Sequence, residues 1–143
     1  MRNPEKKMSK SDPDQLSCIY INDSPEIIEK KIKSSVTDSI KELYYDSDQR
    51  IGVSNLITIY SELSGDSNQH VVKYLQENNL NKVQFKKLLT ELLIEKLTPI
   101  QLELNRLLSD KSYIDRIISD GRDSAAELAE ETLKDVKKII GFT

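Results

Sequence analysis

The chain has 143 residues, of which 37% are hydrophobic and 31% are charged, and its formal net charge is -3. This length fits about one domain, and the composition is typical of a folded chain rather than a disordered one. The mild acidity excludes a basic field over the whole surface, so any nucleic-acid binding has to be local. The single cysteine, Cys18, excludes an internal disulfide. No apolar run approaches the roughly 20 residues of a membrane span.

The first part of the chain is predicted to be irregular before one clear helix start. Residues 1–17 are polar and aperiodic, and Cys18–Ile21 alternates like a short strand. Ser24 is a good N-cap, and Pro25 suits the first helical position, where its missing N–H costs nothing. A helix is therefore predicted from there to about Tyr44. Its apolar stripe consists of Ile28, Ile32, Val36, Ile40 and Leu43.

Helical periodicity continues through the rest of the chain. Gly65 stands where a left-handed C-cap belongs, and Pro99 is expected to kink or interrupt a helix. Gly121 is expected to close another helix before a capping box that starts at Ser124. The fold class is thus mainly α, a helical bundle behind a loop and one short strand, with no internal repeat. The predicted segments cover residues 53–63, 68–77, 85–97, 100–108, 110–121 and 124–140.

Most kinds of chemical site lack their residues in this sequence. His70 is the only histidine, and neither its spacing nor the distant Cys18 fits a zinc site, so no metal site is predicted. His70 is expected at the surface, in the first turn of a short helix. The chain contains neither the glycine-rich phosphate loop of nucleotide hydrolases nor the dinucleotide-binding glycine motif. The abundant carboxylates are expected on solvated helix faces beside lysines.

The segment Lys7-Met8-Ser9-Lys10-Ser11 is the exception. Two lysines three residues apart, with hydroxyls beside them, can converge on a polyphosphate. A lysine on a mobile loop stabilises charge only when the loop closes, which suits a charge that develops in a transition state. Composition alone favours the alternative, a disordered basic leader.

The same five residues match the second signature motif, K-M-S-K-S, of the class I aminoacyl-tRNA synthetases. Further strings resemble the tryptophanyl-tRNA synthetases, of bacterial and above all mitochondrial type, and they follow in order along essentially the whole chain. This resemblance removes the preference for a disordered leader. The matching strings are Ser11–Asp14, Asp23–Ile27, Val36–Asp38, Arg50–Leu56, Leu97–Ile100 and Val136–Phe142.

The resemblance implies a ligase that activates tryptophan with ATP and Mg²⁺, releases pyrophosphate and then esterifies tRNA(Trp). It implies that Lys7 and Lys10 stabilise the pyrophosphate leaving group, while Met8, Ser9 and Ser11 shape the loop and contact ATP. Residues 1–23 would then be a remnant of the catalytic domain, and residues 24–143 the helical domain that binds the anticodon region of tRNA. The resemblance also implies a homodimer for the full-length enzyme, and no membrane partner is expected.

One departure from the family pattern dominates. The chain contains no H-I-G-H-type motif, and no Rossmann domain with its tryptophan pocket is recognisable. We therefore expect the C-terminal part of such an enzyme, catalytically incomplete alone, with any targeting segment upstream of Met1. The matrix of mitochondria is the expected compartment, or the cytoplasm for a bacterial or truncated form. Two alternatives are an inert truncation product and a non-catalytic module that binds tRNA or protein. The second would use the lysines of residues 30–41 together with Lys82, Lys86 and Lys87.

Overall fold

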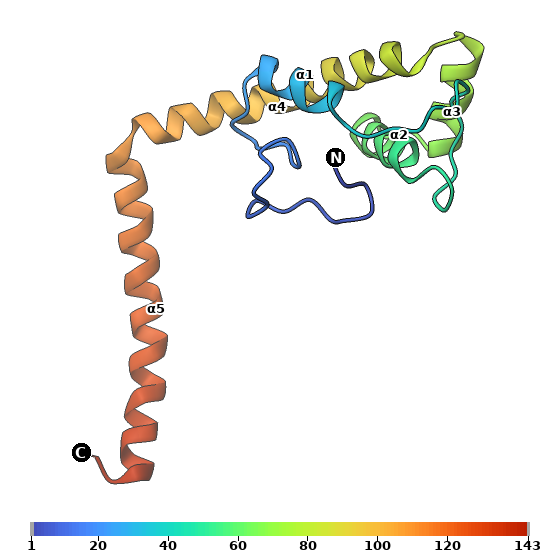
Figure 1. The fold of residues 1–143 in the computed structure, drawn as a ribbon. Helices are drawn as coiled ribbons and strands as arrows, with labels where there is room; N and C mark the ends of the chain where they lie inside the picture. Colours follow the sequence, from blue (N-terminus) through green and yellow to red (C-terminus); the bar gives the residue numbers. More distant parts are fainter. Residues whose placement is uncertain (1, 143) are drawn as a thin grey trace. The chain divides into compact units, whose positions relative to one another are not determined.

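The computed structural model describes residues 2–142, and its regular structure is helical (Figure 1). Within those residues there are five α-helices and no β-strand, which confirms the prediction of a mainly α chain. Residues 1–101 and 102–143 form two units, which are described separately below. The helices are α1 (Pro25–Lys33), α2 (Ile51–Ser64), α3 (Asn68–Glu77), α4 (Lys82–Ser109) and α5 (Lys111–Ile140).

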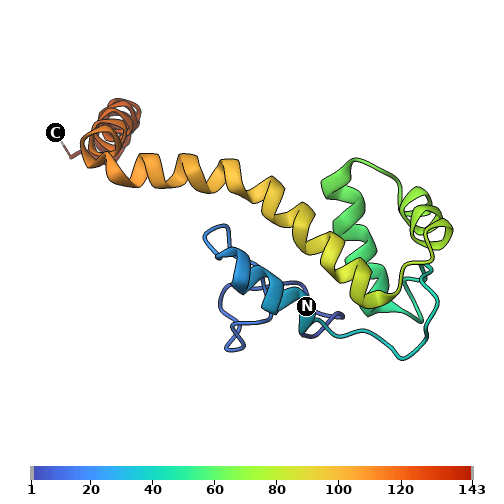
Figure 2. The same ribbon diagram turned by 90° about the horizontal axis from the view of Figure 1, so that it is seen from above.

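The first unit is held together by one apolar core to which α1, α2, α3 and α4 all contribute. Figure 2 shows α2 and α3 beside the first turns of α4. The ring centroids of Tyr60 and Phe85 lie 5.9 Å apart in a tilted arrangement, which joins α2 to α4. The buried members of the core are Ile28, Ile32, Leu43, Val53, Leu56, Ile57, Val71, Leu75, Phe85, Leu89 and Leu93.

One buried guanidinium organises the connector between α1 and α2. The side chain of Arg50 is fully buried and donates from Nε and Nη2 to the two carboxylate oxygens of Asp38, at 2.9 and 2.8 Å. It also donates to the main-chain carbonyls of Ile40 and Glu42, at 3.3 and 2.8 Å. Its guanidinium lies 4.1 Å from the ring centroid of Tyr44. Arg50 therefore supplies the donors that this non-helical segment would otherwise take from water or from secondary structure.

The first helix ends earlier than its apolar spacing predicted. α1 ends at Lys33, so the predicted extension to about Tyr44 is wrong. The Ser35 hydroxyl donates to the carbonyl of Ile32 at 2.6 Å, and that carbonyl is the acceptor that the next helical turn would need. Val36, whose N–H would have bonded there in a longer helix, is 45% exposed.

The predicted strand at Cys18–Ile21 is also wrong, because this run forms a turn instead. The N–H of Asp23 donates to the carbonyl of Tyr20 at 3.1 Å, and the N–H of Tyr20 donates to the Asp23 carboxylate at 2.7 Å. Local bonds thus satisfy main-chain groups that a strand would offer to a neighbour. An alternating pattern of only four residues is too short to distinguish a strand from a turn.

Neither Pro99 nor Gly121 ends a helix. α4 runs through Pro99, which is exposed, so water can serve the carbonyl that its missing N–H leaves unpaired. α5 runs through Gly121 as one helix, where two were predicted. Glycine ends a helix where it adopts a left-handed conformation, as Gly65 and Gly141 do with φ of 82° and 78°.

The second unit consists mainly of α5. The Asp110 side chain caps this helix by accepting the N–H of Tyr113 at 3.1 Å, as predicted from its position. None of the residues of α5 is buried. Its large exposed apolar side chains include Ile117, Ile118, Leu128, Leu133, Val136, Ile139 and Ile140. Among residues 2–142, no helix combines the length and the hydrophobicity that crossing a bilayer requires.

The Asp38→Asn variant tests the role of the buried guanidinium. We expect the free energy of unfolding at pH 7 to fall by about 2–4 kcal/mol, because Arg50 loses its counter-charge. Hydrogen bonds from Arg50 are the main cause that lowers the pKa of Asp38 to about 2, whereas an unfolded aspartate titrates near ~3.9. The carboxylate's contribution is thus complete above roughly pH 4 and is lost as the pH falls towards 2.

Urea denaturation of both proteins at several pH values between 7 and 2 measures this contribution. The difference between wild type and variant should shrink below roughly pH 4. The matched control is Asp48→Asn on the same connector, which is expected to change stability by less than about 0.5 kcal/mol. A difference that stays constant across the whole pH range would contradict the assigned role of Asp38.

Gly52→Ala tests the close approach between α2 and the connector. A Cβ at Gly52 would lie 2.4 Å from the carbonyl oxygen of Val36, so the main chain has to move. We expect a loss of about 1–3 kcal/mol in thermal or urea unfolding. Gly121→Ala is the control, because a Cβ there meets nothing within 4 Å and alanine favours a helix. Equal behaviour of the two variants would show that the contact is not restrictive.

Candidate functional site

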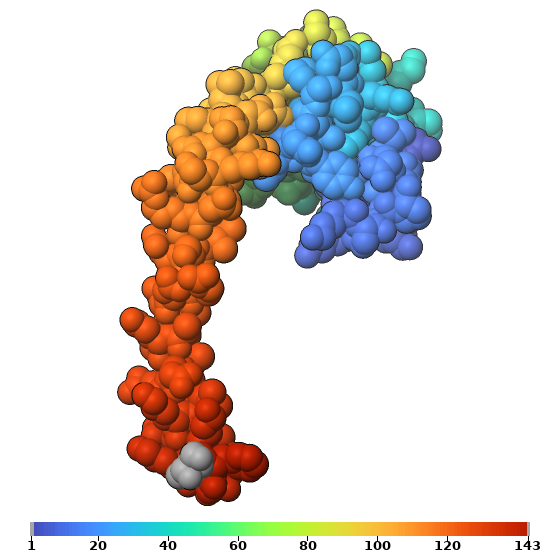
Figure 3. All heavy atoms as spheres, turned by 90° about the vertical axis from the view of Figure 1, so that its left-hand side faces the viewer, coloured from blue at the N-terminus to red at the C-terminus, as the bar shows by residue number. Residues whose placement is uncertain are grey.

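The Lys7–Ser11 loop lies at the surface of the first unit, in the N-terminal segment coloured blue in Figure 3. Lys7 and Lys10 are exposed, and within residues 2–142 neither ammonium group forms an ion pair or a hydrogen bond. Met8 is half-buried and packs against the core, which fixes the loop from inside. The loop therefore presents two cations to solvent from an anchored main chain.

Short local hydrogen bonds give the loop its shape. The hydroxyls of Ser9 and Ser11 lie 3.0 Å apart, and the N–H of Asp12 donates to the carbonyl of Ser9 at 3.2 Å. The Asp14 carboxylate lies 3.4 Å from Nε of Arg2, whose Nη1 donates to the carbonyl of Ser34 just beyond α1. Both ends of the loop are thus tied to the first unit, and both serines keep exposed hydroxyls.

Below the loop, a buried ion pair joins the turn at residues 20–23 to α1. Nζ of Lys31 lies 2.6 Å from Oδ2 of Asp23, and the two side chains are only 3% and 8% exposed. The same ammonium lies 4.5 Å from the ring centroid of Tyr20. The Tyr20 hydroxyl in turn donates to the main-chain carbonyl of Lys10 at 3.2 Å. Contacts therefore run without interruption from α1 to the second lysine of the loop.

Gln101 connects the same turn to α4. Its Nε2 donates to the carbonyls of Ile21 and Asp23, at 2.7 and 2.9 Å. One side-chain amide thus holds two carbonyls of a tight turn, which limits how far the turn can move. The base of the loop is fixed on one side by Lys31 and on the other by Gln101.

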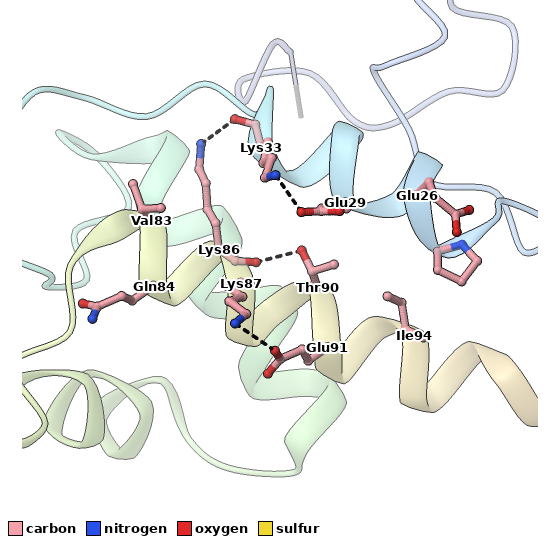
Figure 4. Close-up of a pocket in the computed structure, with 11 residues that line it drawn as sticks. Glu26, Glu29, Lys33, Val83, Gln84, Lys86, Lys87, Thr90, Glu91 and Ile94 are labelled. Atoms are coloured by element: carbon pink, nitrogen blue, oxygen red, sulfur yellow. Dashed lines mark hydrogen bonds and ion pairs between the residues drawn. The ribbon is translucent and has the colours of Figure 1, made fainter.

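A groove between α1 and α4 has a volume of about 560 Å³ (Figure 4). Its lysines are all engaged: Lys33 pairs with Glu29 at 2.6 Å and Lys87 with Glu91 at 3.9 Å. Lys86 donates to the carbonyls of Lys33 and Ser35, at 3.1 and 2.7 Å, and so satisfies acceptors at the end of α1. The bonds from Lys86 join α4 to the end of α1, whereas the other two ion pairs each lie within one helix. The groove therefore has no cluster of unpaired cations among its lining residues.

The lysines predicted as alternative phosphate contacts are therefore not equivalent. Lys82 lies 3.5 Å from the Asp38 carboxylate and also donates to the carbonyl of that residue. Burial, and then the charge of Lys82, lower the pKa of Lys86. Lys30 and Lys41 remain exposed. Phosphate binding by Lys82 or Lys86 would compete with contacts that hold the first unit together.

The only histidine lies apart from the loop. His70 is exposed in the first turn of α3, as predicted, with Nδ1 2.9 Å from the Asp66 carboxylate. Within residues 2–142, no group of three or more histidine, cysteine, aspartate or glutamate side chains is arranged to hold a metal ion. Cys18 is buried.

Comparison with known sequences identifies the family. The family model described as "tRNA synthetases class I (W and Y)" matches residues 1–98, which include the loop, the turn and the first half of α4. The chain belongs to this family of class I tRNA synthetases.

Two curated relatives at 41% identity are both named as tryptophan--tRNA ligases. The chain is 41% identical to the mitochondrial tryptophan--tRNA ligase of Saccharomyces cerevisiae over 143 residues, 99% of this chain and 38% of the relative. It is 41% identical to the tryptophan--tRNA ligase of a Nostoc species over 138 residues, 96% of this chain and 41% of the relative. The chain thus spans about two fifths of the length of these curated relatives.

A solved structure supports the same comparison. The crystal structure of tryptophanyl-tRNA synthetase from Mycoplasma pneumoniae matches with a TM-score of 0.73 and 27% sequence identity, over 99% of this chain and 42% of that one. The resemblance predicted from the sequence motifs is confirmed by these matches.

The sequence pattern does not predict the residues that lie beneath the loop. Lys31 belongs to the lysines of residues 30–41 that the sequence suggests as phosphate contacts, although it lies next to Ile32 and three residues after Ile28, at the edge of the apolar stripe. That position is the signal that could have marked it as buried. Gln101 carries no comparable signal, because its partners are the main-chain carbonyls of Ile21 and Asp23, 80 and 78 residues away. The alternating run before Asp23 does not indicate that its carboxylate bonds Lys31 and the N–H of Tyr20.

Lys31→Met tests whether the buried pair supports the first unit. Methionine retains a chain of similar length, but the variant leaves the Asp23 carboxylate buried without its partner. We expect a loss of about 3–5 kcal/mol in urea denaturation. Lys33→Met on the same helix is the control, because its pair with Glu29 is exposed and is worth less than about 1 kcal/mol. Similar losses in both variants would refute the difference assigned to burial.

Proposed function

We propose that this chain supplies the pyrophosphate-binding loop and the tRNA-binding helices of a tryptophan--tRNA ligase. The observation that carries the proposal is the Lys7–Ser11 loop, where two unpaired ammonium groups project from a main chain that is anchored on both sides. Family membership and the names of the relatives support the reaction class. Lys7 and Lys10 are the proposed catalytic residues.

In the proposed reaction the carboxylate of tryptophan attacks the α-phosphorus of ATP. The bond from that phosphorus to the bridging oxygen breaks, and pyrophosphate leaves with the electron pair and with Mg²⁺. Negative charge grows on the leaving group as the bond breaks, so cations that meet it then lower the barrier. Lys7 and Lys10 supply those charges. Ser9 and Ser11 offer hydroxyls to phosphate oxygens, and Met8 sets the shape of the loop.

The chain alone is proposed to be catalytically incomplete. It contains no H-x-G-H sequence and spans about two fifths of its relatives. The remaining ATP contacts and the tryptophan pocket would therefore come from residues outside this sequence. We assign residues 1–23 to the edge of the catalytic domain and residues 24–143 to the helical domain.

The proposed partners follow from the family. They are ATP with Mg²⁺, tryptophan, tRNA(Trp) and a second copy of the full-length enzyme. The relatives include a mitochondrial enzyme and bacterial ones, and we propose that the chain serves mitochondrial translation or that of a bacterial cytoplasm. The exposed Lys30 and Lys41 are better placed for tRNA phosphates than Lys82 or Lys86, which have internal partners.

Lys7→Ala and Lys10→Ala test the proposed roles in a full-length enzyme that carries these residues. Each is expected to reduce the rate of tryptophan-dependent exchange of pyrophosphate into ATP by about 100-fold, because a group that acts in the transition state is lost. The KM for tryptophan is expected to stay within about twofold, because neither lysine contacts the amino acid.

Two controls frame that measurement. Lys6→Ala removes a neighbouring exposed lysine outside the motif and is expected to exchange at the wild-type rate. The 143-residue chain alone is expected to give only background exchange. Rates of Lys7→Ala and Lys10→Ala that match wild type would refute the proposed roles, and exchange by the isolated chain would refute its incompleteness.

A further inference from the structure

We propose that Tyr20 is a positioning residue that latches the catalytic loop by its main chain. The Tyr20 hydroxyl donates to the carbonyl of Lys10 at 3.2 Å, and that carbonyl belongs to the peptide bond between Lys10 and Ser11. The contact therefore fixes the last peptide bond of the motif without occupying either lysine ammonium. A role of this contact in catalysis rests on the function proposed above, whereas the effect of the contact on the mobility of the loop does not.

The tyrosine ring is held in place by the buried ion pair. The Lys31 ammonium lies 4.5 Å from the ring centroid, at a distance typical of a cation–π contact. The Asp23 carboxylate accepts from that ammonium at 2.6 Å and from the N–H of Tyr20 at 2.7 Å. Both the main chain and the ring of Tyr20 are thus fixed by one pair of charges, so the direction of its hydroxyl is set before the loop moves.

The latch also connects the loop to α1 and α4. Gln101 of α4 holds the carbonyls of Ile21 and Asp23, and Lys31 belongs to α1. A displacement of either helix within the first unit would move Tyr20 and, through it, the carbonyl of Lys10. The helices that we assign to tRNA binding therefore have a direct mechanical route to the catalytic loop.

The Tyr20 phenol is kept in the form that can donate. The neighbouring Cys18 side chain, and then desolvation, raise the pKa of the Tyr20 hydroxyl above the ordinary value. An ordinary tyrosine, with a pKa of about 10, is already protonated at neutral pH, and the raised pKa acts in the same direction. A single neutral hydrogen bond of this kind changes an opening equilibrium by about fivefold.

Limited trypsin digestion of the 143-residue chain tests the latch independently of catalysis. Trypsin cleaves after lysine, so the bond that follows Lys10 is a substrate, and Tyr20→Phe removes the one hydroxyl that holds its carbonyl. Cleavage at this bond is expected to rise about fivefold, relative to cleavage after Lys41 in the same sample. Mass spectrometry reads both cuts, and thermal unfolding is expected to be unchanged within error.

The matched control is Tyr45→Phe, because the Tyr45 hydroxyl forms no hydrogen bond within the described residues and the side chain is 41% exposed. Its cleavage pattern is expected to equal that of wild type. Equal cleavage after Lys10 in wild type and Tyr20→Phe would overturn the latch. An equal rise at both sites would also overturn it, because it would indicate general loosening.

A second measurement asks whether the latch serves catalysis. In a full-length enzyme, Tyr20→Phe is expected to lower the rate of tryptophan activation about fivefold while the KM for tryptophan stays constant. If Lys7→Ala is inactive and Tyr20→Phe exchanges like wild type, the positioning role fails while the proposed function stands. If the wild-type enzyme shows no tryptophan-dependent exchange, the proposed function fails. The trypsin digestion then remains the test of whether Tyr20 restrains the loop.

Discussion

The buried ion pair between Lys31 and Asp23 is the interaction on which the N-terminal segment depends. Residues 2–24 form no helix or strand, so the segment cannot fix itself through regular main-chain hydrogen bonds. The pair replaces them: its carboxylate orders the turn, and its ammonium orders the ring of Tyr20. Two charges removed from water need such additional partners, because their mutual attraction alone hardly offsets desolvation. The stability of the segment and the position of the loop therefore share one cause.

Arg50 solves the same problem for the connector between α1 and α2. Its guanidinium serves the Asp38 carboxylate and main-chain carbonyls together, in a segment that also lacks regular structure. A planar group with five donors can satisfy several acceptors from one position, which a lysine cannot. Both irregular segments of the first unit are thus organised around a buried cation. The apolar core fills the space between the helices. Outside the helices, the hydrogen bonds of Lys31 and Arg50 fix the conformation of the main chain.

Local signals in the sequence predicted the helices well and their ends unevenly. Ser24 and Pro25 marked the start of α1, and the limits of α3 were predicted as observed. The end of α1 was missed because a serine hydroxyl competes with the next turn, which apolar spacing does not reveal. The sequence motif of residues Lys7–Ser11 was sufficient to predict the loop as a candidate site. The residues that hold the loop in place could not be predicted in this way. Gln101, for example, is separated from its partners by 78 and 80 residues, and no local pattern links them.

The absence of buried residues from α5 has a consequence for hydrogen exchange. An amide in α2 or α4 that lies behind the core exchanges with solvent only when much of the first unit opens. An amide in α5 is released by fraying of a single helix, since none of its residues is buried. The 143-residue chain should therefore show two populations of amide protons, one protected by tertiary packing and one exchanging at rates close to those of an isolated helical peptide.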